Sequence, residues 1–374
     1  MLAKTPPMGW NSWNTFGHNI SDALIRETAD AMVDKGYLDA GYNYLVIDDC
    51  WSERERDENG RLVPSREKFP NGMKAVADYV HSKGLKFGMY SDTGTRTCAG
   101  YPGSFEYEYV DARTFAEWGV DFLKYDYCNR PVNSDGKYLY RRMAMALRST
   151  GREILLSACN WGLDDVYDWI RSSGAHMFRS TGDITDNWQS IVDLYTSQIS
   201  KGPYGAPGCY NDIDMLVVGM NGKGNVARGG CSYTEYETHF ALWCMMNSPL
   251  MIGCDIRNAS EETRSILLNK DLIAINQDED GRQPYLALDF YGRHTLVKPL
   301  ANGEYAIGYF NLTDTRTDAL LHFWDIGLPV SSGCALELYD CIKHEPAGTY
   351  INYFNPMLDP HQCAVYRAKV VTIK

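Results

Sequence analysis

The stretch Phe122-Leu-Lys-Tyr-Asp-Tyr-Cys128 decides how the rest of the chain is interpreted. Its apolar residues predict a buried strand, with Lys124 and Asp126 two residues apart near its end. Alternate residues of a strand point to the same side, so this cation and this carboxylate share one face. The later segment 179–186 (RSTGDITD) also places acids after a strand-like run. Carboxylates at two strand ends suggest an active site, although salt bridges at a barrel rim would give the same pattern.

Strand-like and helix-like segments alternate through the first three quarters of the chain. Apolar, β-rich runs cover 8–13, 42–48, 85–91, 120–127, 154–159, 177–181, 208–215 and 241–252, the last being long enough for a helix and then a strand. Helical patterns cover 22–35, 72–82, 107–118, 138–149, 164–171, 187–200 and 233–245. Eight strands that alternate with helices predict an α/β fold, an N-terminal (β/α)8 TIM barrel, whose chemistry sits at the carboxyl ends of the strands.

The pattern changes near residues 278–284. Short alternating segments follow at 295–300, 305–312, 319–323, 335–339, 349–354 and 363–368, separated by turn formers. They predict a small C-terminal antiparallel β-sandwich. We therefore expect a catalytic barrel at 1–280 and a sandwich at 284–374.

Composition limits the classes of function. The 374 residues carry a net charge of -12, which argues against a nucleic-acid or anionic-membrane surface. No stretch approaches the roughly 18 consecutive apolar residues of a membrane span. The N-terminus has no apolar signal region, so we expect a cytoplasmic protein, or a secreted one if a signal was removed. A homo-oligomer is compatible with the sequence.

Cysteine usage does not indicate a metal site. The eleven Cys are an odd number and show no CxxC or Cys/His spacing of the kind that binds zinc. Most of them are interpreted as reduced core thiols.

Polar residues gather where the predicted barrel strands end. These residues are Trp13, Asp48, Asp49, Asp92, Lys124, Asp126, Cys159, Trp161, Arg179, Asp183, Asp212 and Asp214. Several acidic strand ends in register predict a ring of carboxylates around one pocket. Burying that many acids is costly without cations, and Lys124 and Arg179 would supply them.

Seven ordered segments resemble a known family. They are 5–13 (TPPMGWNSW), 47–51 (IDDCW), 88–92 (GMYSD), 97–100 (TCAG), 122–128 (FLKYDYC), 179–186 (RSTGDITD) and 211–215 (NDIDM). The chain resembles the α-galactosidase and α-N-acetylgalactosaminidase family, retaining glycoside hydrolases of clan D, family 27. The motifs span the whole barrel in the family's order, and the C-terminal sandwich also fits.

The resemblance implies two catalytic carboxylates. Asp126 matches the nucleophile that forms the covalent glycosyl-enzyme intermediate, and Asp183 matches the general acid/base, with Asp186 as the nearest rival. We expect Lys124 to lower the pKa of Asp126, and neighbouring acids and partial burial to raise that of Asp183. Retention requires the two carboxyl groups to lie roughly 5–5.5 Å apart. No metal or organic cofactor is expected.

The resemblance also implies how a sugar is held. Asp48 and Asp49 would accept the 6- and 4-hydroxyls, Lys124 would donate to the 3- and 4-hydroxyls, and Arg179 would lie on the side of the 2-substituent. Trp13 would stack on the C5–C6 face. The remaining wall residues would be Tyr90, Cys98, Cys128, Cys159, Trp161, Asp214 and Met215. On the residues alone, Trp13 and Met215 could be core, and Asp48-Asp49 could cap a helix.

The family pattern also bears on cysteines and on one departure. Cys98 and Cys128 match a disulfide beside the pocket, which would be absent or redox-dependent in a cytoplasmic protein. Cys50 lacks its usual partner, since Gly17 and His18 stand where that cysteine would be. In 157–162 (SACNWG), Asn160 replaces the family's acid in the loop that faces the sugar's 2-position. Trp161 still argues for galactose, and Asn160 could point away from the pocket.

The leading interpretation is therefore an α-galactosidase that acts on carbohydrates with terminal α-galactose. α-N-acetylgalactosaminidase is the nearest alternative, and β-L-arabinopyranosidase is less favoured because Asp48 suits a 6-hydroxyl. A Schiff-base aldolase would need a neutral Lys124, which Asp126 on the same face opposes. An inactive sugar-binding protein would be expected to lack a carboxylate, and both Asp126 and Asp183 are present.

Overall fold

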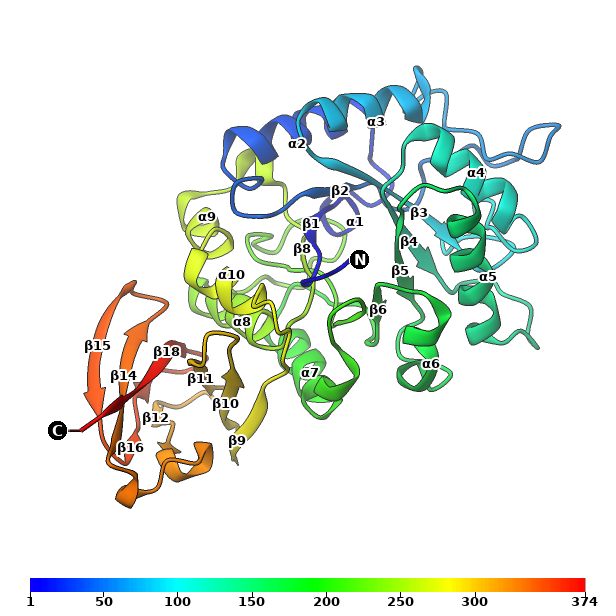
Figure 1. Ribbon diagram of the computed structural model, residues 1–374. Coiled ribbons are helices and arrows are strands. Elements are labelled where there is room, and N and C mark those ends of the chain that lie inside the picture. Colours follow the sequence, from blue (N-terminus) through cyan, green and yellow to red (C-terminus); the bar gives the residue numbers. More distant parts are fainter. Residues whose placement is uncertain (374) are drawn as a thin grey trace.

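The computed structural model describes residues 1–373, and its first part is a barrel of parallel strands surrounded by helices (Figure 1). The strands are β1 (Met8–Asn11), β2 (Tyr44–Val46), β3 (Lys86–Asp92), β4 (Phe122–Asp126), β5 (Leu155–Cys159), β6 (Met177–Arg179), β7 (Tyr210–Asp212) and β8 (Leu250–Ile252). They are ordered β7-β6-β5-β4-β3-β2-β1-β8, and every pair is parallel. A single parallel bridge, Leu216 with Ile252, links the two ends of this sheet. The predicted eight-stranded barrel is confirmed.

Helices follow the strands as predicted. The α-helices are α1 (Trp13–Phe16), α2 (Asp22–Asp34), α3 (Gly72–Ser82), α4 (Glu108–Trp118), α5 (Gly136–Ser149), α6 (Val166–Ser173), α7 (Trp188–Gln198), α8 (Tyr233–Met245), α9 (Glu261–Leu267) and α10 (Lys270–Asn276). Short 3₁₀ turns cover η1 (Ile199–Tyr204), η2 (Ile256–Asn258), η3 (Phe323–Ile326) and η4 (Val330–Ser332). α8 begins with a complete capping box formed by Ser232 and Glu235. No helix in the described part of the chain is long and apolar enough to cross a membrane.

The C-terminal part is antiparallel. Its strands are β9 (Tyr285–Phe290), β10 (Arg293–Pro299), β11 (Tyr305–Asn311), β12 (Thr317–Asp318), β13 (Leu321–His322), β14 (Cys334–Asp340), β15 (Glu345–Tyr350), β16 (Tyr353–Phe354), β17 (Met357–Leu358) and β18 (Cys363–Thr372). Six of them form a sheet ordered β15-β14-β18-β11-β10-β9, and the short ladders β12·β17 and β13·β16 form the rest. The predicted sandwich is confirmed. The predicted segments 319–323 and 349–354 each hold a strand only in part, because a 3₁₀ turn or a break between strands interrupts them.

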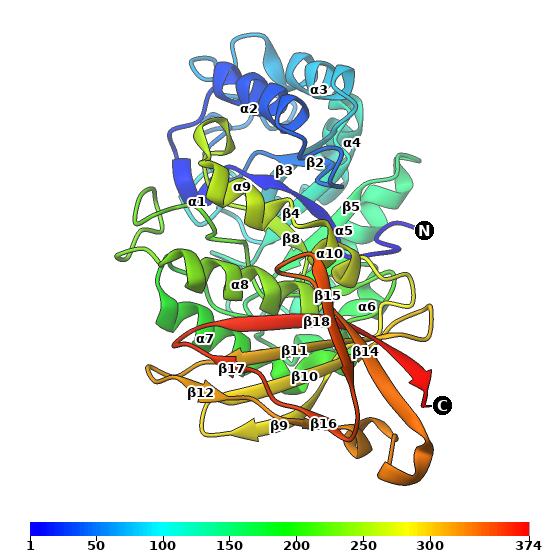
Figure 2. The same ribbon diagram turned by 90° about the vertical axis from the view of Figure 1, so that its left-hand side faces the viewer.

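The sandwich packs directly on the barrel. Leu296 and Phe310 join the large core that contains the barrel helices, whereas their sequence neighbours Val297 and Tyr309 face a separate core inside the sandwich. This alternation is what strands between two apolar layers require. Figure 2 shows β18 and β11 running beside α8. Because one core spans both parts, the limits 1–280 and 284–374 stay predictions.

Lys298 is a buried cation at this junction. It is 0% exposed, and its ammonium donates to Asn247 Oδ1 at 2.5 Å and to the carbonyl of Ile275. Asn247 in turn donates to the carbonyls of Gly281 and Arg282, which lead into the sandwich. Burial lowers the pKa of Lys298 to about 8, because its hydrogen-bond partners are neutral.

The buried ammonium predicts a pH-dependent stability. Between about 8 and the ordinary 10.5, the unfolded chain holds a proton that native Lys298 has lost, so stability rises with pH in this window. Relative to Lys298→Met, the wild-type free energy of unfolding should gain about 2–3 kcal/mol between pH 7 and pH 10. Urea unfolding of both proteins measures this, and ionisation of tyrosines cancels in the difference. A difference that stays flat with pH would contradict it.

Candidate active site

The largest concentration of predicted site residues lies in one pocket at the carboxyl ends of the barrel strands. Its lining consists of Trp13, Asn14, Asp48, Asp49, Tyr90, Cys98, Lys124, Asp126, Cys159, Trp161, Arg179, Asp183, Ile184, Asp214, Met215 and Val226. The sheet register explains this gathering, since Asp92 lies opposite Asp126 and Cys159 lies opposite Arg179. Every residue predicted to react with or contact the sugar lines the pocket except Cys128. Asp92 and Asp212, which the sequence placed in the ring of carboxylates around the pocket, do not line it.

Three lining residues were not predicted. Asn14 and Ile184 directly follow predicted residues in the sequence. Val226 comes from the glycine-rich loop 219–230, which backbone hydrogen bonds from Asn225 and Val226 to the carbonyl of Asn14 hold over the pocket. Adjacency could have suggested the first two, but nothing local in the sequence predicts that this loop reaches the site.

Asp126 is fixed at the end of β4. Its Oδ1 accepts from the backbone N–H of Tyr127 at 3.0 Å, and its Oδ2 accepts from the hydroxyl of Tyr90 at 3.1 Å. Burial raises the pKa of Asp126, and this effect outweighs the lowering by Lys124 and Arg179. The prediction that Lys124 sets a lowered pKa was therefore wrong in its net direction.

Lys124 is paired with Asp48 instead of Asp126. Its Nζ lies 2.9 Å from Asp48 Oδ2, which also accepts from Asn11 at 2.7 Å. Burial alone would lower the pKa of Lys124, but the carboxylate of Asp48 raises it well above its ordinary value. A permanently charged ammonium cannot form a Schiff base, so the aldolase alternative is disfavoured.

Asp49 completes the acidic pair after β2. Its Oδ1 accepts from the N–H of Cys50 at 2.7 Å, and its Oδ2 accepts from the N–H of Ala99 at 3.0 Å. These bonds hold a carboxylate that is buried and would otherwise be costly. Burial nevertheless raises the pKa of Asp49.

Arg179 joins two carboxylates from different strand ends. This buried guanidinium lies 2.6 Å from Asp183 Oδ1 and 2.9 Å from Asp214 Oδ1. Asp214 has a left-handed φ of 95°, a costly conformation for a residue with a side chain. Its carboxylate accepts hydrogen bonds from the N–H groups of Ile184 and Met215, each at 2.7 Å. The strained residue therefore fixes the backbone of two residues that line the pocket.

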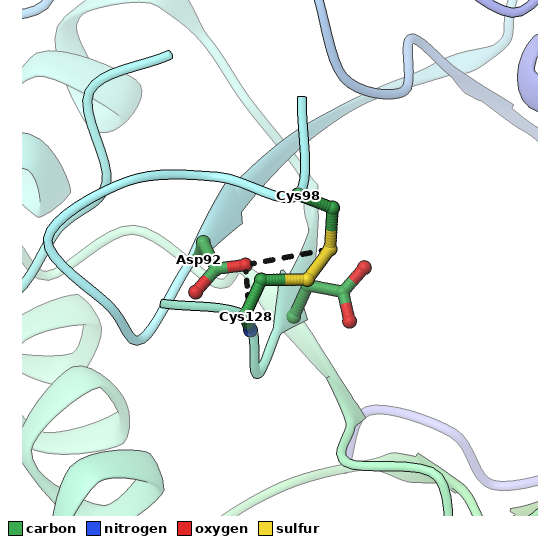
Figure 3. Close-up of side chains that lie close together, drawn as sticks. Asp92, Cys98 and Cys128 are labelled. Carbon is green, nitrogen blue, oxygen red and sulfur yellow. Dashed lines mark hydrogen bonds between the residues drawn. A yellow bond between two sulfur atoms is a disulfide. The ribbon is translucent and has the colours of Figure 1, made fainter. Parts of the chain in front are cut away.

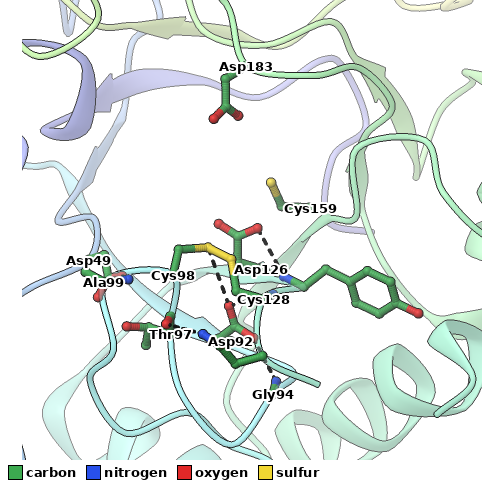
Figure 4. Close-up of a disulfide and its surroundings, with 12 residues drawn as sticks. Asp49, Asp92, Gly94, Thr97, Cys98, Ala99, Asp126, Cys128, Cys159 and Asp183 are labelled. Carbon is green, nitrogen blue, oxygen red and sulfur yellow. Dashed lines mark hydrogen bonds between the residues drawn. A yellow bond between two sulfur atoms is a disulfide. The ribbon is translucent and has the colours of Figure 1, made fainter. Parts of the chain in front are cut away.

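Asp183 is the exposed member of the site. Its side chain is 75% exposed, at the open side of the pocket. Partial desolvation would raise its pKa, but the charge and hydrogen bond of Arg179 lower it below the ordinary value. The predicted raised pKa is therefore wrong for the sugar-free protein. In Figure 4 the carboxyl groups of Asp183 and Asp126 face one another across the pocket.

Asp186, the rival for the acid/base role, does not line the pocket. It is 0% exposed and accepts from the N–H of Gly222 at 2.7 Å and the hydroxyl of Tyr236 at 2.8 Å. These bonds anchor the loop that carries Val226. The buried position of Asp186 outside the pocket therefore favours Asp183 as the general acid/base.

The disulfide between Cys98 and Cys128 is present, with the two Cα atoms 5.1 Å apart. Asp92 lies beside it and accepts from the N–H of Cys128 at 3.0 Å (Figure 3). Asp92 also accepts from the N–H of Gly94 at 2.7 Å (Figure 4). Burial and the neighbouring Asp126 raise the pKa of Asp92 to about 8. Only Cys98 reaches the pocket wall, so the predicted contact of Cys128 with substrate is not supported.

The loop after β5 explains the departure at Asn160. Asn160 is 0% exposed, donates to the carbonyl of Leu163 at 2.7 Å, and does not line the pocket. Cys159 and Trp161 on either side of it do line the pocket. Asn160 therefore stabilises the turn and leaves the wall to its neighbours. Cys50 is buried and unpaired in the described residues, as its missing partner predicted.

Comparisons with known proteins agree with this geometry. The family model described as alpha galactosidase A matches residues 5–278, and the one described as alpha galactosidase C-terminal beta sandwich domain matches 292–368. The chain is 42% identical over 366 residues to an α-galactosidase of Cyamopsis tetragonoloba, covering 98% of this chain and 86% of that protein. The crystal structure of α-galactosidase I from Mortierella vinacea superposes with a TM-score of 0.92 at 32% identity, over 100% of this chain and 99% of that one. The structure of α-galactosidase from Saccharomyces cerevisiae with raffinose superposes with a TM-score of 0.89 at 29% identity, over 99% and 98%.

Proposed function

The chain belongs to the alpha galactosidase A family, and we infer that it is an α-galactosidase, a hydrolase that releases terminal α-linked D-galactose from oligosaccharides or glycoconjugates. The observation that best supports the chemistry is the pair of carboxyl groups, Asp126 and Asp183, that face one another across the pocket (Figure 4). One is buried and rigidly held, and the other is exposed at the open side. This asymmetry suits a nucleophile and an acid/base.

The proposed reaction is a double displacement. Asp126 attacks the anomeric carbon while Asp183 protonates the departing glycosidic oxygen, which forms a covalent galactosyl-enzyme intermediate. Asp183 then takes a proton from water, and that water displaces Asp126. Tyr90 and the N–H of Tyr127 orient the carboxylate of Asp126 for the attack, because each holds one of its oxygens.

The walls support galactose as the sugar. Asp48 and Asp49 offer carboxylates to the 6- and 4-hydroxyls, and Lys124, held by Asp48, offers its ammonium to the 3- and 4-hydroxyls. Arg179 stands on the side of the 2-hydroxyl, between Asp183 and Asp214. Trp13 offers an aromatic face to the C5–C6 edge, and Met215 completes the wall.

The 2-position decides between the two nearest activities. Cys159 and Trp161 both line the pocket there, and bulky side chains leave less room for an N-acetyl group than small ones. The alternative activity, α-N-acetylgalactosaminidase, requires a more open loop. Asp48 in the pocket wall offers an acceptor for a 6-hydroxyl group. β-L-Arabinopyranosides have no 6-hydroxyl group, so this residue favours galactose over arabinose.

Hydrolysis of nitrophenyl α-galactoside against nitrophenyl α-N-acetylgalactosaminide tests this proposal. We expect kcat/KM to favour the galactoside by about 100-fold or more, because the acetamido group would collide with Cys159 and Trp161. Asp126→Asn, purified identically, controls for contaminating glycosidases. Preference for the acetylated sugar would overturn the choice of substrate, and failure on both sugars would overturn the proposed activity.

A further inference from the structure

Four metal-ligating side chains meet at the floor of the pocket, where Cys98 and Asp126 line it and Asp92 and Cys128 lie behind them. Asp92, Cys98, Asp126 and Cys128 each place one donor atom so that all four atoms lie within 4.8 Å of one another. Two carboxylate oxygens and two sulfurs form a donor set that thiophilic d¹⁰ cations such as zinc and cadmium accept in tetrahedral sites. Among the described residues, these four are the His, Cys, Asp or Glu side chains whose donor atoms lie close enough together to bind one ion.

The carboxylates of this cluster are held in place by bonds that do not depend on the disulfide. Asp92 accepts from the N–H groups of Gly94 and Cys128, and Asp126 accepts from Tyr90 and the N–H of Tyr127. Both sit at the ends of neighbouring strands, opposite each other in the register. Strand ends are rigid supports, so two of the four donors would stay in position if the sulfurs were freed.

The sulfurs are within reach of the same point. Cys98 Sγ lies 3.9 Å from Asp92 Oδ2 (Figure 3). It also lies 3.5 Å from the hydroxyl of Tyr90, which donates to Asp126. While the sulfurs are bonded to one another, neither can supply a thiolate. Cys98 is exposed and lines the pocket, so a small reductant can reach the bond without unfolding.

We propose that reduction of the Cys98–Cys128 disulfide converts the pocket floor into a binding site for one thiophilic divalent cation, held by both sulfurs and by Asp92 and Asp126. A water-soluble phosphine breaks the S–S bond: phosphorus is oxidised to the phosphine oxide with oxygen from water, and each sulfur becomes a thiol. The cation then displaces both thiol protons to the buffer and binds the two thiolates. The oxidised form has no thiolate to offer, so the site exists only after reduction.

Occupation of this site would also block catalysis. The cation would hold the carboxylate of Asp126, so that carboxylate could not attack a sugar. This consequence rests on the proposed role of Asp126, whereas the binding itself does not. Binding and inhibition are therefore measured separately.

The experiment titrates oxidised and phosphine-reduced protein with cadmium chloride without oxygen, and follows thiolate-to-cadmium charge-transfer absorption in the ultraviolet. The nine remaining cysteines are unpaired in both forms, so their contribution cancels. We expect the reduced protein to bind about one more cadmium ion per chain than the oxidised protein, reversibly with a chelator. No additional cadmium, or loss of the native circular dichroism on reduction, would overturn the site.

Variants assign the ligands. Cys98→Ser should abolish the additional cadmium, and Asp92→Asn should weaken it by about tenfold or more. Cys231→Ser, a free and partly buried cysteine outside the pocket, is the matched control and should change nothing. Equal binding by wild type and Cys98→Ser would overturn the assignment. Reduced protein that binds the ion but keeps full galactosidase activity would contradict the contact with Asp126, while the thiolate signal would stand.

Discussion

Asp126→Asn is expected to lower turnover of every α-galactoside by about 10⁴-fold or more, because the amide cannot form the covalent intermediate. The substitution keeps size and shape, and its carbonyl oxygen can still accept from Tyr90 or Tyr127. Burial already raises the pKa of this group, so replacing it by a neutral amide removes a buried charge. The thermal midpoint should therefore stay the same or rise.

Steady-state hydrolysis and thermal unfolding measure this prediction together. Retained binding of galactose by the variant would show that the pocket is intact. Near-normal turnover by Asp126→Asn would exclude the residue as nucleophile, and a collapse of stability would make the loss of activity uninformative about chemistry.

A smaller side chain gives a sharper version of the test. In Asp126→Ala the face that the carboxylate occupied is open to a small anion, so added azide should attack the anomeric carbon from there. Starting from an activated α-galactoside, the product should be β-galactosyl azide. Formation of this inverted product identifies the vacated position as that of the nucleophile, and α-galactosyl azide would contradict it.

The sequence was sufficient to predict the barrel and most of its pocket because the strand ends carry the signal. Lys124 and Asp126 share a strand face, and parallel register brings Asp92, Cys159 and Arg179 to the same end of the barrel. Such placement follows from alternation and topology alone. It needs no side-chain geometry.

Pairing of charges could not be predicted in the same way. Several carboxylates surround each cation, and small differences in the distance between the charged groups decide which carboxylate forms the ion pair. Lys124 bonds Asp48 from a different strand, and Arg179 bonds Asp183 four residues later as well as Asp214. The bond to Arg179 lowers the pKa of Asp183, and burial raises the pKa of Asp126 despite the nearby cations, so both predicted directions were wrong.

Contacts between residues far apart in the sequence could not be predicted either. Val226 reaches the pocket through hydrogen bonds to Asn14, more than two hundred residues earlier in the chain. α9 and α10, which follow the last barrel strand in the sequence, and β9, the first strand of the sandwich, were also not predicted. The buried apolar residues of α9 and α10 belong to the large core, whereas Leu286 and Ala287 of β9 pack against the two different cores.

The reversed pKa order has a mechanistic consequence. In the sugar-free protein burial raises the pKa of Asp126, and Arg179 lowers the pKa of Asp183. The reaction requires the opposite arrangement. Entry of the sugar must exclude water from the exposed Asp183 and weaken its contact with Arg179, which would raise its pKa.

Asp183→Asn is therefore expected to affect substrates according to their leaving groups. A dinitrophenyl galactoside needs little protonation, so release of the phenol should slow by less than about tenfold. Hydrolysis of an α-galactoside with a sugar as leaving group should slow by about 10²–10⁴-fold. The alkaline fall of kcat/KM should vanish for the activated substrate, because only Asp126 must then be ionised. Asp186→Asn is the matched control. It should weaken the hydrogen bonds that Gly222 and Tyr236 donate to residue 186, but kcat/KM should still fall at alkaline pH.

Azide separates the second step in the same variant. Without Asp183 no base activates water, so the galactosyl-enzyme should accumulate and azide, which needs no base, should restore turnover. The covalent bond to Asp126 blocks one face of the sugar, so azide must enter from the other face and give α-galactosyl azide. Asp126→Ala should give the β product, so the two variants should yield opposite anomers from one substrate. Equal loss of activity on both substrates, without rescue by azide, would remove Asp183 from the acid/base role.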